Sequence, residues 1–141
     1  MPKNKIRLKI ITPAKVKVDE PADMIIMRCT SGDMGVLPGH EPRCAVLDYA
    51  SLRIRGGGYE RRIAVYGGLA VIENDVLTIL TGDAEWPEEI DLAQAQADRE
   101  HAQQRLRERE DDTELRSDQV LLRRALVQIE VCSFTLTQGE E

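Results

Sequence analysis

Aromatic residues are scarce in this sequence: one Trp, three Tyr and one Phe make up 4% of 141 residues. Proteins that bind single-stranded nucleic acids commonly stack bases on aromatic side chains, so this scarcity argues against such a surface. The charge balance agrees, because 25 acidic residues outnumber 19 basic ones and give a net charge of −6. Nucleic-acid-binding proteins normally present a basic face, and we therefore expect no nucleic-acid partner.

Long apolar runs and paired cysteines are also missing. No run approaches the roughly 18 residues that a membrane-spanning helix needs, so we expect no direct membrane insertion. The three cysteines, Cys29, Cys44 and Cys132, are far apart and form no CxxC pair. That pattern is typical of reduced thiols and indicates no metal site. Each thiol is expected to act as a small buried apolar side chain.

No set of catalytic residues emerges from the sequence. Its two histidines, His40 and His101, are not flanked by a nucleophile or by carboxylates at metal-ligand spacing. Gly56-Gly57-Gly58 is not followed by the Gly-Lys-Ser/Thr of a phosphate-binding loop, so it predicts a hairpin turn. We expect no catalytic residue, no bound metal and no enzymatic activity in the isolated chain.

What the sequence does contain is two halves with different hydrophobic periods. From Ile6 to about Leu80 apolar and polar residues alternate, as in Ile6, Leu8 and Ile10, and turn signals such as Gly67-Gly68 and Asn74-Asp75 separate the runs. Short strands joined by hairpin turns are typical of an antiparallel sandwich or barrel. The pattern predicts a β-sandwich of about ten short strands over residues 1–86.

The second half, residues 87–141, predicts an antiparallel two-helix hairpin, which makes the fold class α+β. Pro87 suits the first position of a helix that extends to about residue 109, and Asp111-Asp112-Thr113 offers an N-cap for a second helix. The inner faces are expected to carry Leu92, Ala95, Ala102 and Leu106 in the first helix, and Leu115, Leu122, Ala125, Leu126 and Ile129 in the second. So thin an apolar face favours a mobile hairpin, and a rigid cap on the sandwich is the alternative.

The segment from Gly32 to His40, with the sequence GDMGVLPGH, is the most distinctive motif. Its glycines tolerate positive φ and Pro38 restricts φ, so it predicts a short strand between tight turns, with Asp33 and His40 presented at its ends. The residues of this segment, considered alone, are equally consistent with a plain pair of β-turns.

Taken in order, these features resemble the epsilon subunit of bacterial F-type ATP synthase over essentially the whole chain: the sandwich, the GDMGVLPGH segment, Tyr66-Gly67-Gly68 before a last hairpin, and two C-terminal helices. The resemblance implies a subunit of the central stalk that binds the gamma subunit and the membrane c-ring at the cytoplasmic face of the membrane. It implies contacts with the ring or gamma through the motif residues Asp33, Gly35, Pro38, Gly39 and His40. It does not indicate whether the coupling ion is H⁺ or Na⁺.

The resemblance also implies a regulatory role for the two helices, which in this family extend into the alpha/beta catalytic hexamer and inhibit ATP hydrolysis. Arg116, Arg123 and Arg124 are then candidates for that contact, and a solvated basic face remains the alternative. Some relatives bind ATP through an Ile/Leu-Asp-x-x-Arg-Ala motif. Here Ile90, Asp91 and Ala95 match that motif, but Gln94 replaces the arginine, so we expect weak or no ATP binding and no cofactor.

Two segments depart from the family pattern: Glu41-Pro42-Arg43-Cys44 is polar where relatives are apolar, and Asp48-Tyr49-Ala50-Ser51 lacks a Pro-Gly turn. A free-standing β-sandwich adaptor that docks partner helices through its hairpin is the alternative function.

Overall fold

A computed structural model describes residues 4–108 and 115–139. The chain divides into two compact units, Met1–Glu85 and Trp86–Glu141. The expected cap at Asp111-Asp112-Thr113 lies outside the described residues. The first unit consists of strands and the second of helices, so the fold class predicted from the sequence is confirmed.

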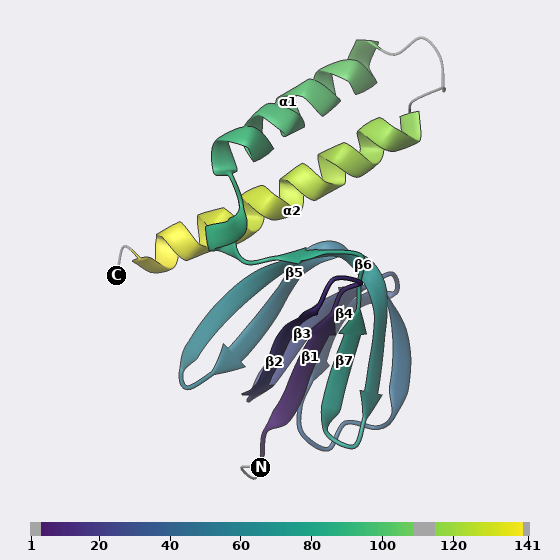
Figure 1. The fold of residues 1–141 in the computed structure, drawn as a ribbon, viewed down its shortest axis with the longest axis vertical. Helices are drawn as coiled ribbons and strands as arrows, with labels where there is room; N and C mark the ends of the chain where they lie inside the picture. Colours follow the sequence, from purple (N-terminus) through teal and green to yellow (C-terminus); the bar gives the residue numbers. More distant parts are fainter. Residues whose placement is uncertain (1–3, 109–114, 140–141) are drawn as a thin grey trace. The chain divides into compact units, whose positions relative to one another are not determined.

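The first unit is one β-sheet that curves round on itself into a sandwich (Figure 1). Its strand order is β2-β1-β7-β6-β5-β3-β4, and β8 pairs with β6. Neighbouring strands run antiparallel except β1 and β7, which are parallel. The strands are β1 (Ile6–Ile11), β2 (Val16–Ala22), β3 (Met24–Cys29), β4 (Gly32–Val36), β5 (Arg43–Gly56), β6 (Tyr59–Glu73), β7 (Val76–Leu80) and β8 (Ala84–Glu85).

The eight strands replace the expected ten because β5 and β6 are unusually long, with 14 and 15 residues. The first half of β6 pairs with β8 and its second half pairs with β7, so one strand serves both sides of the sandwich. Gly67 and Gly68, expected to form a turn between strands, lie inside β6 with φ of +75° and +130°. Their unusual backbone conformation bends the strand without ending it.

Alternate residues of the strands form the core of the sandwich, as the period of two predicted. Ile6, Leu8 and Ile10 of β1 are fully buried, and so are Leu77 and Ile79 of β7. Two hairpins close through two-residue turns in which both residues have positive φ: Gly57-Gly58 between β5 and β6, and Asn74-Asp75 between β6 and β7. This is the conformation of a type I′ turn, whose twist matches that of the flanking strands.

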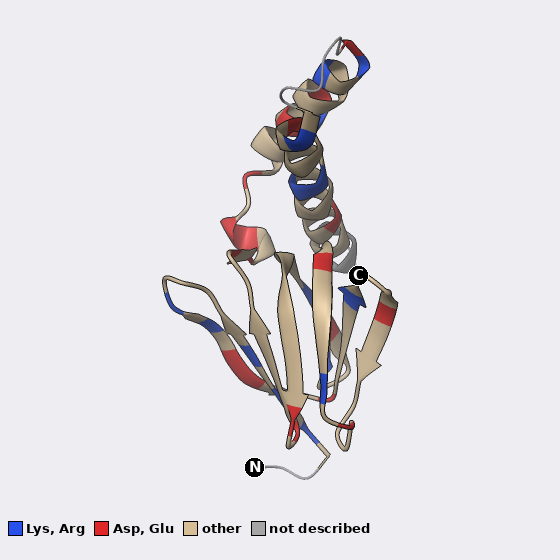
Figure 2. Ribbon diagram, turned by 90° about the vertical axis from the view of Figure 1, so that its right-hand side faces the viewer, with Lys and Arg blue, Asp and Glu red and all other residues tan. Residues whose placement is uncertain are grey.

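The first α-helix of the second unit begins later in the sequence than expected. Pro87–Glu89 forms a short 3₁₀ helix, η1, and α1 follows only at Leu92–Glu108. Asp91 caps α1, because its Oδ1 accepts a hydrogen bond from the backbone N of Gln94 at 3.1 Å. The second helix, α2, spans Leu115–Gly139. Figure 2 shows acidic and basic residues interspersed along the two helices.

Small side chains let α1 and α2 pack closely. Ala95 and Ala102 of α1 and Ala125 of α2 are at most 1% exposed, which confirms three members of the expected inner faces. Leu126 is 45% exposed, so its placement on the inner face was wrong. The buried residues Asp118 and Ala125 are seven positions apart and lie on the inward face of α2. Leu126 is one position further along the helix and therefore points about 100° away from that face.

Candidate functional site

The motif strand β4 lies at an edge of the sheet, beside β3. Asp33 is its second residue and faces Arg28 across the β3–β4 ladder, where Arg28 Nε donates to Asp33 Oδ1 at 3.1 Å. Both side chains are more than half exposed, at 54% and 58%. An ion pair in this setting contributes little to stability, so the carboxylate of Asp33 is accessible and oriented by Arg28.

The second part of the motif, residues 37–40, forms a tight turn after β4. The backbone N of His40 donates to the carbonyl O of Leu37 at 3.1 Å, and Gly39 has a φ of +84°. The ring Nδ1 of His40 lies 2.8 Å from the carbonyl O of Glu41. Leu37 is 51% exposed. The turn therefore presents an apolar side chain and a histidine whose ring is oriented by the backbone carbonyl of the next residue, Glu41.

The structure does not bring Asp33 and His40 together. Asp33 lies near the start of β4 and the turn follows its end, which at about 3.3 Å per residue separates their backbones by on the order of 10 Å. Gly35 lies between them, opposite Ile26, and a Cβ there would stand 2.8 Å from Cε of Met24. The motif residues thus line one sheet edge and the turn beyond it, which makes an extended contact surface and not a pocket.

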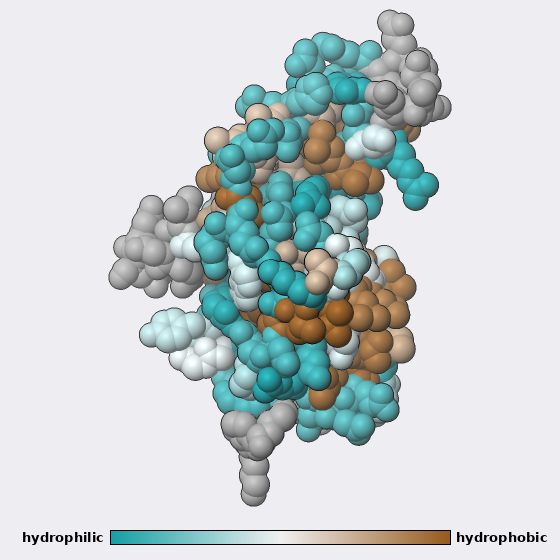
Figure 3. All heavy atoms as spheres, in the orientation of Figure 1, coloured by the Kyte–Doolittle hydropathy of each residue, from teal (hydrophilic) through white to brown (hydrophobic). Residues whose placement is uncertain are grey.

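A second surface feature was missed by the sequence analysis: an apolar row across the outer face of five neighbouring strands. Cross-strand register aligns these residues one beside the next, in the order Val46, Leu69, Leu80, Ile11 and Val16. Four of them are 39–55% exposed. Figure 3 shows hydrophobic residues gathered on one side of the sandwich.

Exposed apolar rows of this kind are typical of surfaces that contact another protein. Sequence alone could not distinguish it from the core, because residues 69–72 read as one continuous apolar run. Only the register shows that Leu69 faces outward while Ala70 is fully buried.

The two segments that depart from the family pattern occupy defined places. Asp48-Tyr49-Ala50-Ser51 continues β5 through its bend, so no turn is required there. Cys44 is exposed, contrary to the expectation of burial, and lies two residues from Val46 on the same outward side of β5. Cys29 and Cys132 are buried as expected, and burial raises the pKa of the Cys29 thiol.

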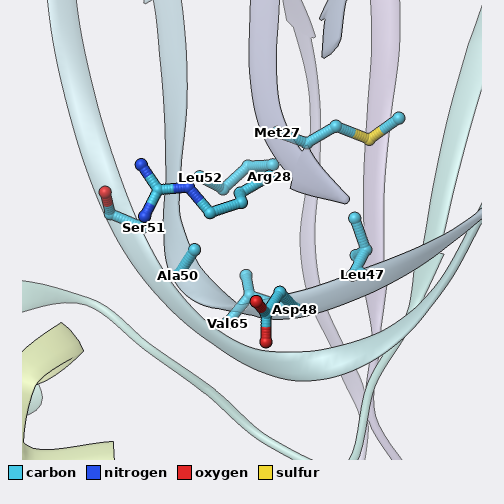
Figure 4. Close-up of a pocket in the computed structure, with 8 residues that line it drawn as sticks. All are labelled: Met27, Arg28, Leu47, Asp48, Ala50, Ser51, Leu52 and Val65. Atoms are coloured by element: carbon cyan, nitrogen blue, oxygen red, sulfur yellow. The ribbon is translucent and has the colours of Figure 1, made fainter. Parts of the chain in front are cut away.

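A small cavity lies at the bend of β5, lined by residues of β3, β5 and β6 (Figure 4). Its volume of about 10 Å³ is at most that of one water. The lining residues are Met27, Arg28, Leu47, Asp48, Ala50, Ser51, Leu52 and Val65. A cavity this small is not a binding site for an organic ligand.

One residue of the expected nucleotide motif, Ile90, borders a larger cavity in the second unit, with a volume of about 270 Å³. Among the described residues its lining comes from η1, α1, α2 and the segment between η1 and α1, is mostly apolar and includes no Lys or Arg: Pro87, Glu88, Ile90, Leu92, Cys132 and Thr135. The carboxylate of Asp91 is engaged as the helix cap, and the side chain of Gln94 donates to Asp98 at 2.8 Å. Nothing in this lining offers the positive charge that phosphate groups require.

The three arginines proposed to contact a catalytic hexamer all lie on α2. Arg116 and Arg123 are exposed and Arg124 is half-buried. Arg116 and Arg123 are seven residues apart and therefore share one face of the helix. Among residues 4–108 and 115–139, no group of three His, Cys, Asp or Glu side chains is placed to hold a metal ion, and no helix is long and apolar enough to cross a membrane.

Comparison with protein families identifies both units. Residues 5–87 match the beta-sandwich domain of the ATP synthase delta/epsilon chain, and residues 88–133 match the long alpha-helix domain of the same chain. The two matched segments meet between Pro87 and Glu88, close to the boundary between the two compact units.

Comparison with individual proteins gives the same result. The chain is 36% identical to the ATP synthase epsilon chain of Bacillus velezensis, covering 89% of this chain and 96% of that one. It is 39% identical to the epsilon chain of Syntrophobacter fumaroxidans, covering 93% and 98%. A chain in the Euglena gracilis mitochondrial ATP synthase structure superposes with a TM-score of 0.77 at 27% identity, covering 94% and 81%. This chain belongs to the ATP synthase delta/epsilon chain family.

Proposed function

We propose that this chain is a non-catalytic subunit of the central stalk of a bacterial F-type ATP synthase, where it rotates with the gamma subunit and the c-ring and couples ion flow to ATP synthesis. One observation carries the proposal. Both family domains are present in order, and the chain covers nearly the full length of relatives named ATP synthase epsilon chain. A β-sandwich is suited to this work, because transmitting torque requires stiffness and firm contacts.

The gamma subunit is the partner we assign to the apolar row. A long-lived interface needs an apolar centre that is dry once covered, and the row of Val46, Leu69 and Leu80 with its neighbours offers one on a rigid sheet. Cys44 adjoins this row, so the unusual segment at residues 41–44 modifies the edge of the same contact. Failure of the full chain to bind its cognate gamma subunit in solution would contradict the whole assignment and favour a free-standing adaptor.

The c-ring is the partner we assign to the edge formed by β4 and its following turn. Asp33 presents an accessible carboxylate that accepts charge-assisted hydrogen bonds from basic side chains of the ring loops. Gly35, Pro38, Gly39 and His40 shape the backbone that meets the ring. This contact places the chain at the cytoplasmic face of the membrane as a peripheral subunit.

Reversing the charge at Asp33 tests the ring contact. We expect Asp33→Arg to lower ATP-driven ion pumping in reconstituted vesicles while ATP hydrolysis continues, because the new guanidinium repels basic ring side chains. Asp33→Asn should give a smaller loss, since it removes the charge without repulsion. Asp19→Arg is the matched control, because it breaks a comparable Asp–Arg pair on β2, where Arg7 Nε and Asp19 Oδ1 lie 2.7 Å apart. Normal pumping with Asp33→Arg would remove Asp33 from the contact.

The two helices are the inhibitory element in this proposal. Extended from the stalk, α2 would carry Arg116, Arg123 and Arg124 to acidic segments of the alpha/beta catalytic hexamer and slow ATP hydrolysis. The support is the placement of Arg116 and Arg123 on one exposed face of a helix of 25 residues.

Regulation by ATP is not part of the proposed function. No basic residue is among the described residues that line the cavity beside Ile90, and Gln94 stands where the motif arginine would be. Losing a charged hydrogen bond costs about 1.5–3 kcal/mol, or one to two orders of magnitude in affinity. We expect calorimetric titration of the full chain with ATP to show no micromolar binding, and Gln94→Arg to increase the affinity. Micromolar binding by the unchanged chain would contradict this.

A further inference from the structure

We infer that Asp75, in the turn between β6 and β7, is a positioning residue that holds the motif turn in the conformation that meets the ring; the inference rests on the proposed ring contact. Its carboxylate Oδ1 accepts a hydrogen bond from the backbone N of Gly39 at 2.7 Å, across 36 residues of sequence. No motif or periodicity in the sequence connects these two positions.

The hydrogen bond is made by a backbone that has few other restraints. Gly39 is exposed, and nothing lies within 4 Å of the position that a Cβ would occupy there. Its φ of +84° belongs to a region that the chain leaves readily without an anchor. The bond from His40 N to Leu37 O closes the turn upon itself, whereas the bond to Asp75 fixes the turn to the sheet.

Asp75 itself is fixed at both its backbone and its side chain. Its carbonyl O accepts from the backbone N of Arg7 at 2.8 Å, which ties the β6–β7 turn to the start of β1. Its φ of +60° is tolerated by Asp and Asn better than by most residues with a side chain. The anchor therefore stands on the rigid hairpin of β6 and β7, and its carboxylate oxygen offers a fixed acceptor to the Gly39 N–H.

This arrangement extends the ring-facing site beyond the linear motif. While Asp75 restrains it, the turn at Pro38, Gly39 and His40 holds a single conformation. The turn is therefore ordered before it contacts the ring. When a loop is ordered before binding, the entropy cost of ordering it no longer lowers the affinity. The loss of the anchor should lower affinity without removing any group that touches the ring.

Two substitutions isolate this hydrogen bond. Asp75→Gly adopts the positive φ without strain and removes the acceptor, whereas Asp75→Asn keeps both the conformation and an acceptor oxygen. Asp19→Gly, on β2, controls for the loss of an exposed carboxylate elsewhere in the sandwich. The first measurement is the amide chemical shift and hydrogen-exchange rate of Gly39 and His40 in the full chain. The second is binding of the chain to vesicles that carry the cognate c-ring and gamma subunit.

We expect Asp75→Gly to shift the Gly39 amide, to speed its exchange, and to weaken binding to the vesicles by about tenfold, while Asp75→Asn stays within about twofold of the unchanged chain. An unaltered Gly39 amide in Asp75→Gly would overturn the inference. Equal loss of binding in Asp75→Asn and Asp75→Gly would also overturn it, since the charge and not the anchor would then matter. If the Gly39 amide changes in Asp75→Gly, but both Asp75→Gly and Asp33→Arg bind the vesicles normally, then the anchor exists and the proposed ring contact is wrong.

Discussion

At the scale of single residues, the bend of β6 depends on two glycines that act for different reasons. Gly67 has a φ of +75°, and a Cβ there would stand 3.4 Å from the ring of Tyr49. Tyr49 packs against Tyr66 with ring centroids 5.9 Å apart. Gly68 is more restricted still, because a Cβ at that position would lie 2.2 Å from the carbonyl O of Leu80. The second half of β6 can approach β7 so closely only without a side chain there.

We therefore expect Gly68→Ala to destabilise the sandwich by about 3 kcal/mol or more, since it combines a backbone clash with a strained φ. The change in the free energy of unfolding is measured by chemical denaturation of the full chain. Gly82→Ala is the matched control, because nothing lies within 4 Å of its Cβ position and its φ is ordinary. Similar stability of both variants would show that β6 can bend without Gly68.

At the scale of elements, charged side chains join β5 and β6 on one face of their hairpin. Glu60 Oε1 accepts from Arg53 Nη2 at 3.2 Å and from Arg55 Nε at 2.8 Å, and Oε2 accepts from Arg62 Nε at 3.2 Å. Partial burial acts to raise the pKa of Glu60, but the hydrogen bonds from Arg55, Arg53 and Arg62 outweigh it and lower the pKa to about 2. The glutamate thus cross-links two long strands beside their turn.

The lowered pKa of Glu60 makes the stability of the chain depend on pH in a defined direction. The pKa of Glu60 is lower in the folded state than its ordinary value of 4.5, so its contribution to stability is complete above pH 4.5 and is lost as the pH falls toward about 2. We expect Glu60→Gln to lower stability at pH 7 by up to about 3 kcal/mol. The difference between the two proteins should shrink as the pH falls through this range.

Urea denaturation of the unchanged chain and Glu60→Gln, at several pH values from neutral to acid, measures this difference. Other carboxylates titrate in both proteins, so their contribution cancels in the comparison. A difference that stays constant over the whole range would mean that Glu60 stabilises the hairpin by packing and not by its charge.

The helical hairpin depends on a different combination of contacts. Small residues at Ala95, Ala102 and Ala125 allow close approach of the helices but bury little apolar area. Asp118 is 4% exposed, and Arg105 Nε lies 3.4 Å from its Oδ1. The Arg105 side chain is 43% exposed, so the pair joins a buried carboxylate to a partly solvated cation and links α1 to α2 at this position. A hairpin with so little apolar packing is suited to opening.

At the scale of the whole molecule, the chain consists of two units with unequal cores. Of the large side chains that are fully buried among the described residues, all but Val131 lie in the sandwich. The strand ladder is also complete before Trp86, since β8 ends at Glu85. The sandwich therefore contains what it needs to fold without the helices.

We expect deletion of residues 87–141 to leave a sandwich that unfolds cooperatively, and to increase ATP hydrolysis by the complex that contains it. Circular dichroism with thermal unfolding measures the first outcome, and steady-state hydrolysis by the reconstituted complex measures the second. Replacing Arg116, Arg123 and Arg124 together by Gln is the matched control, because it keeps the helices and removes the proposed contact. Unchanged hydrolysis after the deletion would separate inhibition from this part of the chain.

Much of this could be predicted because local sequence carries it. Ile6, Leu8 and Ile10 alternate with charged residues and can face only one side of a strand, and the turn at Gly57-Gly58 needs the positive φ that glycine adopts freely. The start of α1 was misplaced because Pro87 opens a 3₁₀ turn equally well, and only the cap at Asp91 determines where the helix begins. Leu126 was misplaced because two adjacent helical positions look alike until a partner helix selects one.

The sequence by itself determined the order of strands and helices, the place where one unit gives way to the other, and the family, since these depend on residue spacing and on turn residues. Only the tertiary structure decided that Leu69 faces outward in line with Val46 and Leu80, and that Asp75 anchors Gly39. The physical reason is that both features join residues from separate strands. Their contact depends on the register of the sheet and on its bend at Gly67 and Gly68, which no local pattern encodes.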